Sequence, residues 1–432
     1  MINNRLRILL LSGVMALAAC GGGGSSTSPP AGPPASASPP PASAPPPTPA
    51  TAENSVALVV DGGPAELSRS GGVAVNTAFA SVTLCTPGAA SCQTIDHVAI
   101  DTGSVGLRIV SSALSGAAAP KPVTDPASGS PLRECVQFAD GYTWGSVVTA
   151  DVQIGNRKLS SLPLNLIGDA AAGSAPPTCV SGPAENTVAS FGANGVLGIG
   201  NFLQDCGANC VSNAHPARYY VCPPNGTAAG CTPTKVALDH QVPNPVAVMG
   251  SDNNGVTIQL GAVPGQGAAT ATGILSFGVG TQGNNSLGSA RLFTLDGAGT
   301  FVTNFEGVSD AGFVDSGSNA YFFPSKTLPT CADAPDFYCP KSGANPTSVP
   351  QTAAIVGRNG LSATVGFTVD NADQVFATNS SALPGLAGTT ATLSGGLGGA
   401  FDWGLPFFYG RNVFVLFEGQ TLGSTAGPAV GF

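Results

Sequence analysis

Charged residues are scarce in this chain. They make up 9% of it, with 15 Lys and Arg against 24 Asp and Glu, which gives a net charge of −9 at pH 7. No basic cluster occurs, so we do not expect a nucleic-acid partner. The three histidines lie far apart and no C-x-x-C is present, so we expect neither a metal nor another cofactor. The G-x-S-x-G elbow of many serine hydrolases is also missing.

Long segments of helical period are missing too. The chain is instead rich in Gly, Ser, Thr and Val, with many short apolar runs, which is typical of an all-β protein. Residues 55–432 are too many for one ordinary core and suit two lobes. "VALDHQVPNP", residues 236–245, carries two prolines between β-rich regions, so we predict lobes at 55–240 and 241–432.

The first nineteen residues predict a signal peptide. Arg5 and Arg7 precede an apolar stretch that is too short to span a bilayer as a mature helix. "LAAC", residues 17–20, resembles the lipobox of bacterial lipoproteins, which implies cleavage before Cys20 and lipidation of its thiol. Gly21, by the same resemblance, implies the outer membrane of the cell envelope. An ordinary secretory signal followed by a chance cysteine is the alternative.

Residues 20–54 predict a disordered tether. They are almost entirely Gly, Ser, Pro, Ala and Thr, and such a segment buries too little apolar surface to offset its ordering entropy. A tether of this kind would hold a globular domain away from a membrane.

Ten cysteines remain after Cys20, an even number in a chain with an export signal. This pattern predicts disulfides. Pairing of sequence neighbours gives Cys85–Cys92, Cys135–Cys179, Cys206–Cys210, Cys222–Cys231 and Cys331–Cys339.

An Asp-[Ser/Thr]-Gly-Ser motif occurs twice, in "VAIDTGS" and "GFVDSGS", residues 98–104 and 312–318. Each copy ends a short buried-strand pattern and opens a glycine-containing turn. Each also has an apolar, glycine-closed run downstream, "NGVLGIG" at 194–200 and "FDWGLPFF" at 401–408. Glycine there lets another backbone approach closely. The order strand, motif, glycine strand therefore repeats, which indicates an internal repeat of domain size.

With these paired motifs, the chain resembles the pepsin-like aspartic peptidases. Residues 79–104 resemble that family's opening hairpin, residues 138–155 its flap hairpin and residues 407–419 its penultimate strand. The resemblance implies an all-β bilobal fold, with two pseudo-symmetric β-barrel lobes and the active cleft between them.

The resemblance also assigns roles to the motif residues. Asp101 and Asp315 would be the catalytic pair that shares one proton and activates a water. The residues that would support this pair are Thr102, Gly103, Ser104, Ser316, Gly317 and Ser318. Ordinary turn capping by these residues remains the structural alternative.

The flap residue is left open by the sequence. Members of the family usually carry a tyrosine near the tip of the flap hairpin, and two residues here are candidates for that position, Phe138 and Tyr142. The family tryptophan that would hydrogen-bond it is replaced by Arg108, and Trp144 is a candidate substitute. Tyr142 and Trp144 are equally compatible with ordinary sheet packing.

The expected function is acid-pH endopeptidase activity by a monomer on a polypeptide substrate. No Lys or Arg lies between Arg7 and Arg69, so a basic prosegment that plugs the cleft is not expected. The alternatives are a catalytically silent relative that binds peptides or glycans, and an adhesin-like β-protein in which both motifs are only turns.

Overall fold

A computed structural model describes residues 52–223, 228–390 and 399–432. The predicted signal peptide 1–19, Cys20 and most of the predicted tether lie outside these residues. The described helices are short: α1 Ala65–Arg69, α2 Val188–Phe191, α3 Ala208–Ser212 and α4 Ala372–Phe376, with 3-10 turns η1 Ser111–Ala113, η2 Ala170–Ala172, η3 Ala228–Gly230, η4 Leu238–His240, η5 Gly283–Asn285 and η6 Leu405–Phe408. None of the described helices is long and apolar enough to cross a membrane. The remaining elements are strands, so the predicted all-β class is confirmed.

The first half is built around a closed ring of strands. Its members are β2 Ala78–Cys85, β3 Cys92–Asp101, β4 Val105–Val110, β7 Tyr142–Ile154, β8 Arg157–Ile167 and β9 Gly195–Ile199. They pair in the order β2-β3-β9-β4-β8-β7, and a further pairing between β7 and β2 closes the ring. The short strands β5 Lys121–Pro122, β6 Leu132–Gln137, β10 Tyr219–Val221 and β11 Thr232–Pro233 extend this sheet beyond β7. A closed ring has no free edge within it, which removes the exposed strand edges of an open sheet.

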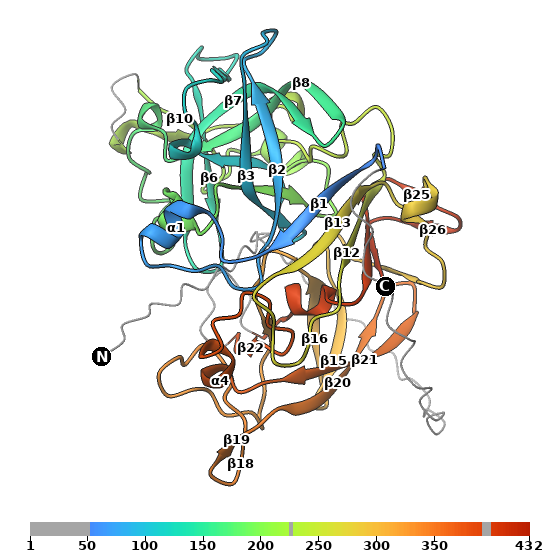
Figure 1. The fold of residues 1–432 in the computed structure, drawn as a ribbon. Coiled ribbons are helices and arrows are strands. Elements are labelled where there is room, and N and C mark those ends of the chain that lie inside the picture. Colours follow the sequence, from blue (N-terminus) through green and yellow to red (C-terminus); the bar gives the residue numbers. More distant parts are fainter. Residues whose placement is uncertain (1–51, 224–227, 391–398) are drawn as a thin grey trace.

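A second run of strands continues the same sheet between the two halves. It comprises β1 Ser55–Val60, β13 Ala271–Phe277, β12 Gly255–Leu260, β24 Asn412–Leu416, β27 Ala429–Gly431 and β14 Leu292–Thr294. β1 runs antiparallel to β13, with Ser55 opposite Ser276. Figure 1 shows β1, β12 and β13 between the blue and green first half and the orange and red second half. The predicted division at residue 240 therefore separates two paired strands, β1 and β13.

The second half holds a separate seven-stranded sheet. Its order is β21-β20-β15-β16-β23-β17-β22. The bounds are β15 Phe301–Phe305, β16 Val308–Val314, β17 Tyr321–Phe322, β20 Val349–Val356, β21 Ser362–Val369, β22 Ala387–Gly388 and β23 Phe401–Trp403. Two small hairpins pair β18 Lys341–Ser342 with β19 Asn345–Pro346, and β25 Thr421–Leu422 with β26 Thr425–Ala426.

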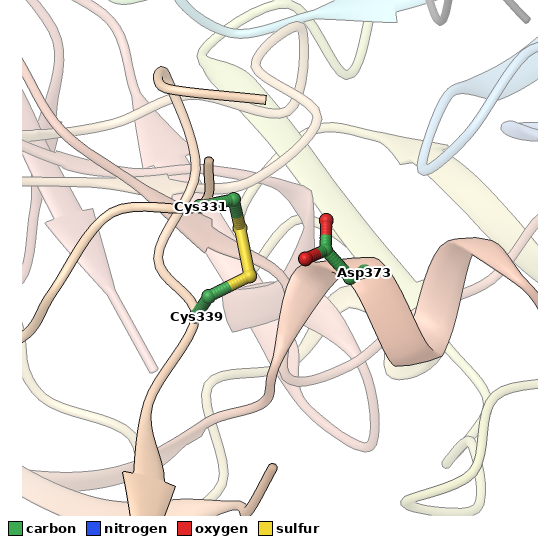
Figure 2. Close-up of side chains that lie close together, drawn as sticks. All are labelled: Cys331, Cys339 and Asp373. Atoms are coloured by element: carbon green, nitrogen blue, oxygen red, sulfur yellow. A yellow bond between two sulfur atoms is a disulfide. The ribbon is translucent and has the colours of Figure 1, made fainter. Parts of the chain in front are cut away.

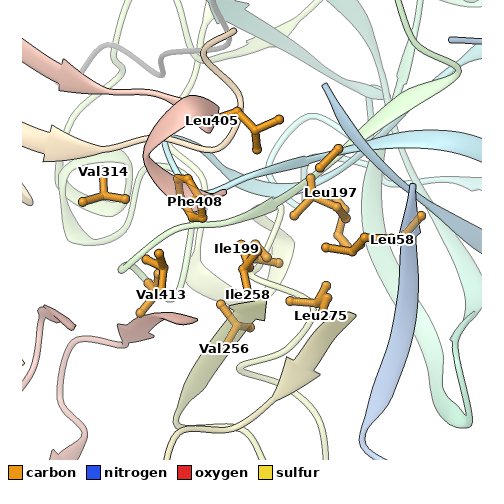
Figure 3. Close-up of a cluster of buried hydrophobic side chains, with 14 of the residues drawn as sticks. Leu58, Leu197, Ile199, Val256, Ile258, Leu275, Val314, Leu405, Phe408 and Val413 are labelled. Atoms are coloured by element: carbon orange, nitrogen blue, oxygen red, sulfur yellow. The ribbon is translucent and has the colours of Figure 1, made fainter. Parts of the chain in front are cut away.

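One apolar core runs through both halves. It contains Leu58 and Leu197 from the first half, and Val314 and Phe408 from the second, all less than a tenth exposed. Figure 3 shows these side chains with those of the strands between the halves. Because burial of apolar area is the main favourable term in folding, this shared core fixes the position of the halves relative to each other.

The folded region begins before residue 55. Asn54 is fully buried, and its side-chain amide donates to the carbonyl of Phe277. The last residues of the predicted tether therefore belong to the fold, because they satisfy polar groups of β13.

The described residues contain five disulfides, and all five predicted pairings are confirmed: Cys85–Cys92, Cys135–Cys179, Cys206–Cys210, Cys222–Cys231 and Cys331–Cys339.

Candidate active site

The first motif lies at the end of β3. The glycine strand β9 runs parallel to β3 on one side and antiparallel to β4 on the other, so it lies between the strands that flank Asp101-Thr102-Gly103-Ser104. A Cβ on Gly198 would lie 2.7 Å from the backbone nitrogen of Val105. That contact is too close for any side chain, which explains why the apolar run has a glycine at this position.

The second motif repeats this arrangement. β23 runs parallel to β16, whose last residue Val314 directly precedes Asp315, and antiparallel to β17. A Cβ on Gly404 would lie 2.0 Å from the carbonyl oxygen of Ala320. The internal repeat predicted from the sequence is therefore present in three dimensions, strand for strand around each motif.

The two motifs meet, and their aspartates are in contact. Asp101 and Asp315 are both fully buried, and their carboxyl groups hydrogen-bond to each other. A Cβ on Gly103 would lie 2.6 Å from Cγ of Asp315, so the first turn packs directly on the second carboxyl group. Two carboxyl groups in such contact do not both ionise readily, because like charges repel at short range.

Four hydrogen bonds cross between the turns in a reciprocal pattern. The Thr102 hydroxyl donates to the Val314 carbonyl at 3.0 Å and accepts from the Ser316 backbone N–H at 2.9 Å. The Ser316 hydroxyl donates to the Ile100 carbonyl at 2.8 Å and accepts from the Thr102 backbone N–H at 3.1 Å. Each half thus holds the other half's turn, which fixes the separation of the two carboxyl groups.

Each aspartate also receives two hydrogen bonds from its own turn. The backbone N–H of Gly103 donates to Asp101 Oδ1 at 2.7 Å, and Gly317 donates to Asp315 Oδ1 at 2.8 Å. The Ser104 hydroxyl donates to Asp101 Oδ2, and the Ser318 hydroxyl donates to Asp315 Oδ2 at 2.9 Å. These donors favour the charged form of each carboxyl group.

The balance of these effects favours a retained proton. Burial raises the pKa of Asp101 well above its usual value, and the negative charge of Asp315 raises it further, while the Ser104 and Gly103 donors oppose the rise. A buried pair with one proton can take a proton from water with one member and donate one with the other. The structure thus brings all eight motif residues predicted from the sequence into one site.

The hairpin of β6 and β7 reaches toward this site. Its tip spans residues 138–141, closed by a bond from the Phe138 N–H to the Gly141 carbonyl. Ala139 belongs to the same buried apolar cluster as Val75, Ala320 and Phe322. Because Ala320 follows Ser318 by two residues, the tip packs beside the second motif, which is where a flap would lie.

The three aromatic candidates at this hairpin lie in different environments. Phe138 is buried against Phe191, and Tyr142 is half-buried. Trp144 is buried against Tyr220 inside the lobe, and its indole N–H donates to the Ala172 carbonyl. The expectation that Trp144 supplies the missing hydrogen bond to a flap tyrosine is therefore wrong, because its single donor is used elsewhere.

Arg108 is part of a buried charged cluster rather than of the flap. Its guanidinium bonds to Glu134 at 2.6 Å and lies 3.7 Å from Asp205, whose other oxygen accepts from the Tyr219 hydroxyl at 2.6 Å. Burial raises the pKa of Glu134 to about 8, because it outweighs the attraction of Arg108, and the nearby Asp205 adds to the rise. This cluster ties β4 and β6 to the segment between Cys206 and Cys231.

Two residues at the site were missed from the sequence. Asn76 is buried, and its amide donates to the carbonyls of Asn319 and Leu383. These bonds connect the segment before β2 to the second half. No sequence signal marks Asn76. Asp402 is buried within β23 and interacts electrostatically with both Asp315 and Asp101. Its signal was visible, because an acidic residue interrupts the apolar run "FDWGLPFF".

One group of potential metal ligands occurs among the described residues, at Cys331, Cys339 and Asp373. Figure 2 shows that the two sulfur atoms are joined in a disulfide beside the Asp373 carboxylate. Disulfide sulfurs are not thiolate ligands, so this group is not suited to a metal.

Comparison with known proteins gives a family and a structural likeness. The chain belongs to the family described as protein of unknown function (DUF3443), whose model matches residues 50–432. The search of curated proteins found no match. Among solved structures, the chain is similar to the aspartic proteinase from Irpex lacteus, with 15% identity, a TM-score of 0.49, and coverage of 87% of this chain and 96% of that chain. The strand pairings described above, rather than this likeness, define the fold around the site.

Proposed function

We propose that this member of the DUF3443 family is an aspartic endopeptidase that hydrolyses peptide bonds at acidic pH. The observation that carries the proposal is the contact between Asp101 and Asp315. These buried carboxyl groups come from two repeated turns, and reciprocal hydrogen bonds hold them together. Isolated turn aspartates would not require this cross-bonding, which favours a catalytic pair over two structural turns.

The chemistry would need no covalent intermediate. The ionised member of the pair takes a proton from a water molecule, which attacks the scissile carbonyl carbon. The protonated member donates to the carbonyl oxygen as negative charge develops on it. The raised pKa of Asp101 keeps one proton in the pair at a pH where an ordinary carboxyl group is ionised. The proton belongs to the pair, so neither aspartate is assigned a fixed role.

We also propose where the enzyme acts and on what. Cys20 would carry a lipid anchor at the bacterial cell envelope, at the outer membrane, and the tether would hold a monomeric catalytic region away from the bilayer. The substrate would be a polypeptide that enters beside the hairpin tip at residues 138–141.

Cleavage of an unfolded protein at pH 3–5 tests the proposal. We expect cleavage that pepstatin, an inhibitor of aspartic peptidases, blocks. Asp101→Asn and Asp315→Asn should each lower the rate by about 10²–10⁴-fold, because each removes one partner in proton transfer. Circular dichroism should show that both variants remain folded. Full activity in either variant would refute the proposal.

A catalytically silent, peptide- or glycan-binding surface lipoprotein is the second candidate. It is favoured by the complete burial of both aspartates and by Arg108 at the position of the family tryptophan. Binding of pepstatin without cleavage at any pH from 2 to 8 would support this candidate over the peptidase.

A further inference from the structure

Asp402 places a third carboxyl group beside the pair. The residue is 2% exposed, and its Oδ1 has no hydrogen-bond partner among the residues that the structure describes. An unpaired buried polar atom destabilises the folded state, because the atom has lost its hydrogen bonds to water. Few such groups occur in native proteins, and each calls for an explanation.

The repeat shows what an ordinary residue at this position looks like. In the first half, Val196 pairs with Ala99, two residues before Asp101. In the second half, Asp402 pairs with Phe313, two residues before Asp315. Val196 is fully buried in an apolar cluster. Packing alone would therefore favour an apolar side chain at position 402, and the carboxyl group departs from the symmetry of the site.

Ser318 connects Asp402 to the pair. Its hydroxyl donates to Asp315 Oδ2 at 2.9 Å and also hydrogen-bonds to the Asp402 carboxyl group. A hydroxyl has a single hydrogen, so Ser318 donates to only one of the two carboxyl groups at a time. Burial, with the charges of Asp315 and Asp101, raises the pKa of Asp402 well above its usual value, and the Ser318 hydroxyl opposes the rise.

We propose that Asp402 is a positioning residue that ionises beside the pair and thereby extends the pair's single-proton form to higher pH. This inference rests on the proposed function. The ionisable groups that act on Asp402 are Asp315 and Asp101, and its strand partners Phe313 and Phe322 are apolar. When Asp402 ionises, its negative charge opposes loss of the last proton from the pair.

The test compares Asp402→Asn with wild type in the full chain. Asparagine keeps the shape and can donate to Ser318, but it cannot ionise. Carboxyl titration is followed by NMR with 13C-labelled aspartate, and cleavage is measured from pH 2 to 8. Asp402→Asn should lower, by on the order of one pH unit, both the pH at which the pair loses its last proton and the alkaline limit of cleavage. Asp370→Asn is the matched control, because Asp370 is also buried with a raised pKa but does not contact the motifs.

The two readouts separate this inference from the proposed function. A shifted titration in a protein that never cleaves would support the role of Asp402 and refute the peptidase. An unchanged titration of the pair would overturn the inference whether or not the protein cleaves. If Asp402→Asn does not fold, the carboxyl titration of the wild-type protein tests the inference instead. A coupled Asp402 titrates in more than one step, and a single independent step would overturn the inference.

Discussion

In the first half of the molecule the strand that carries the aspartate belongs to a closed ring, whereas in the second half it belongs to an open sheet in the described residues. Four of the five disulfides lie between residues 85 and 231, and one lies in the second half. The second half has an aromatic core instead, in which Phe401 stacks on Phe323 and Trp403. Disulfides in the first half and aromatic packing in the second half thus support the same motif on two different sheet architectures.

This difference between the halves shows which features the site requires and which features of the surrounding sheets can vary. Both halves retain the parallel glycine strand, the crossing hydroxyl and the backbone donors to the aspartate. These features touch the carboxyl groups, while the strands farther out do not. The geometry of the pair therefore depends on a small, repeated set of contacts.

The largest expected effect concerns the aromatic core. Phe401 contacts four other rings, and Phe138 in the first half contacts one. Loss of a buried Phe side chain costs about 3–5 kcal/mol, and each ring pair adds about 0.5–1.5 kcal/mol. Phe401→Ala should therefore lower the free energy of unfolding more than Phe138→Ala, as measured by urea denaturation. Equal losses would show that ring packing does not distinguish the halves.

A smaller effect tests the symmetry of the turns. Thr102→Val and Ser316→Ala each remove a hydroxyl and leave a buried N–H and a buried carbonyl without that partner, at about 1–3 kcal/mol for each group left unpaired. We expect similar losses of stability in both variants by thermal unfolding, and slower cleavage. Thr83→Val, which removes an exposed hydroxyl contact with Thr94, should have little effect. A large loss in only one motif variant would contradict the reciprocal arrangement.

A pH-dependent effect concerns the buried charged cluster of Arg108, Glu134 and Asp205 in the first half. The pKa of Glu134 in the fold is about 8, above its usual 4.5, so its protonation stabilises the fold at low pH. The free energy of unfolding should fall as pH rises from 4.5 to 8, by at most about 1.4 kcal/mol per pH unit from this group.

Glu134→Gln should remove that part of the pH dependence, as measured by urea denaturation across the range. Glu53→Gln, at an exposed position, is the control and should keep the wild-type slope. A wild-type slope in Glu134→Gln would show that Glu134 does not take up this proton.

The parts that sequence predicts are local. Asp101 and Asp315 were recognisable because each lies between a strand pattern and a glycine turn. The cysteine pairs were recognisable because four of them close loops of four to nine residues. These signals lie within a few residues of the group they describe.

The parts that sequence did not predict depend on the course of the chain. Arg108 meets Glu134 and Asp205 only because β4, β6 and the following segment converge. Trp144 could not be placed on one face of its hairpin until its partner Ala172 was known. Asn76 acts through carbonyls of the second half that no local pattern reveals.

The pairing of β1 with β13 affects how the protein can be made and divided. The first strand of the fold completes its hydrogen bonds only with residues 271–277, which a ribosome adds much later. A fragment that ends at residue 240 would leave one side of β1 without its partner, and such an edge readily joins that of another molecule. Synthesis of the two halves as separate polypeptides should therefore yield aggregates, and mixing the halves before either folds should recover soluble protein.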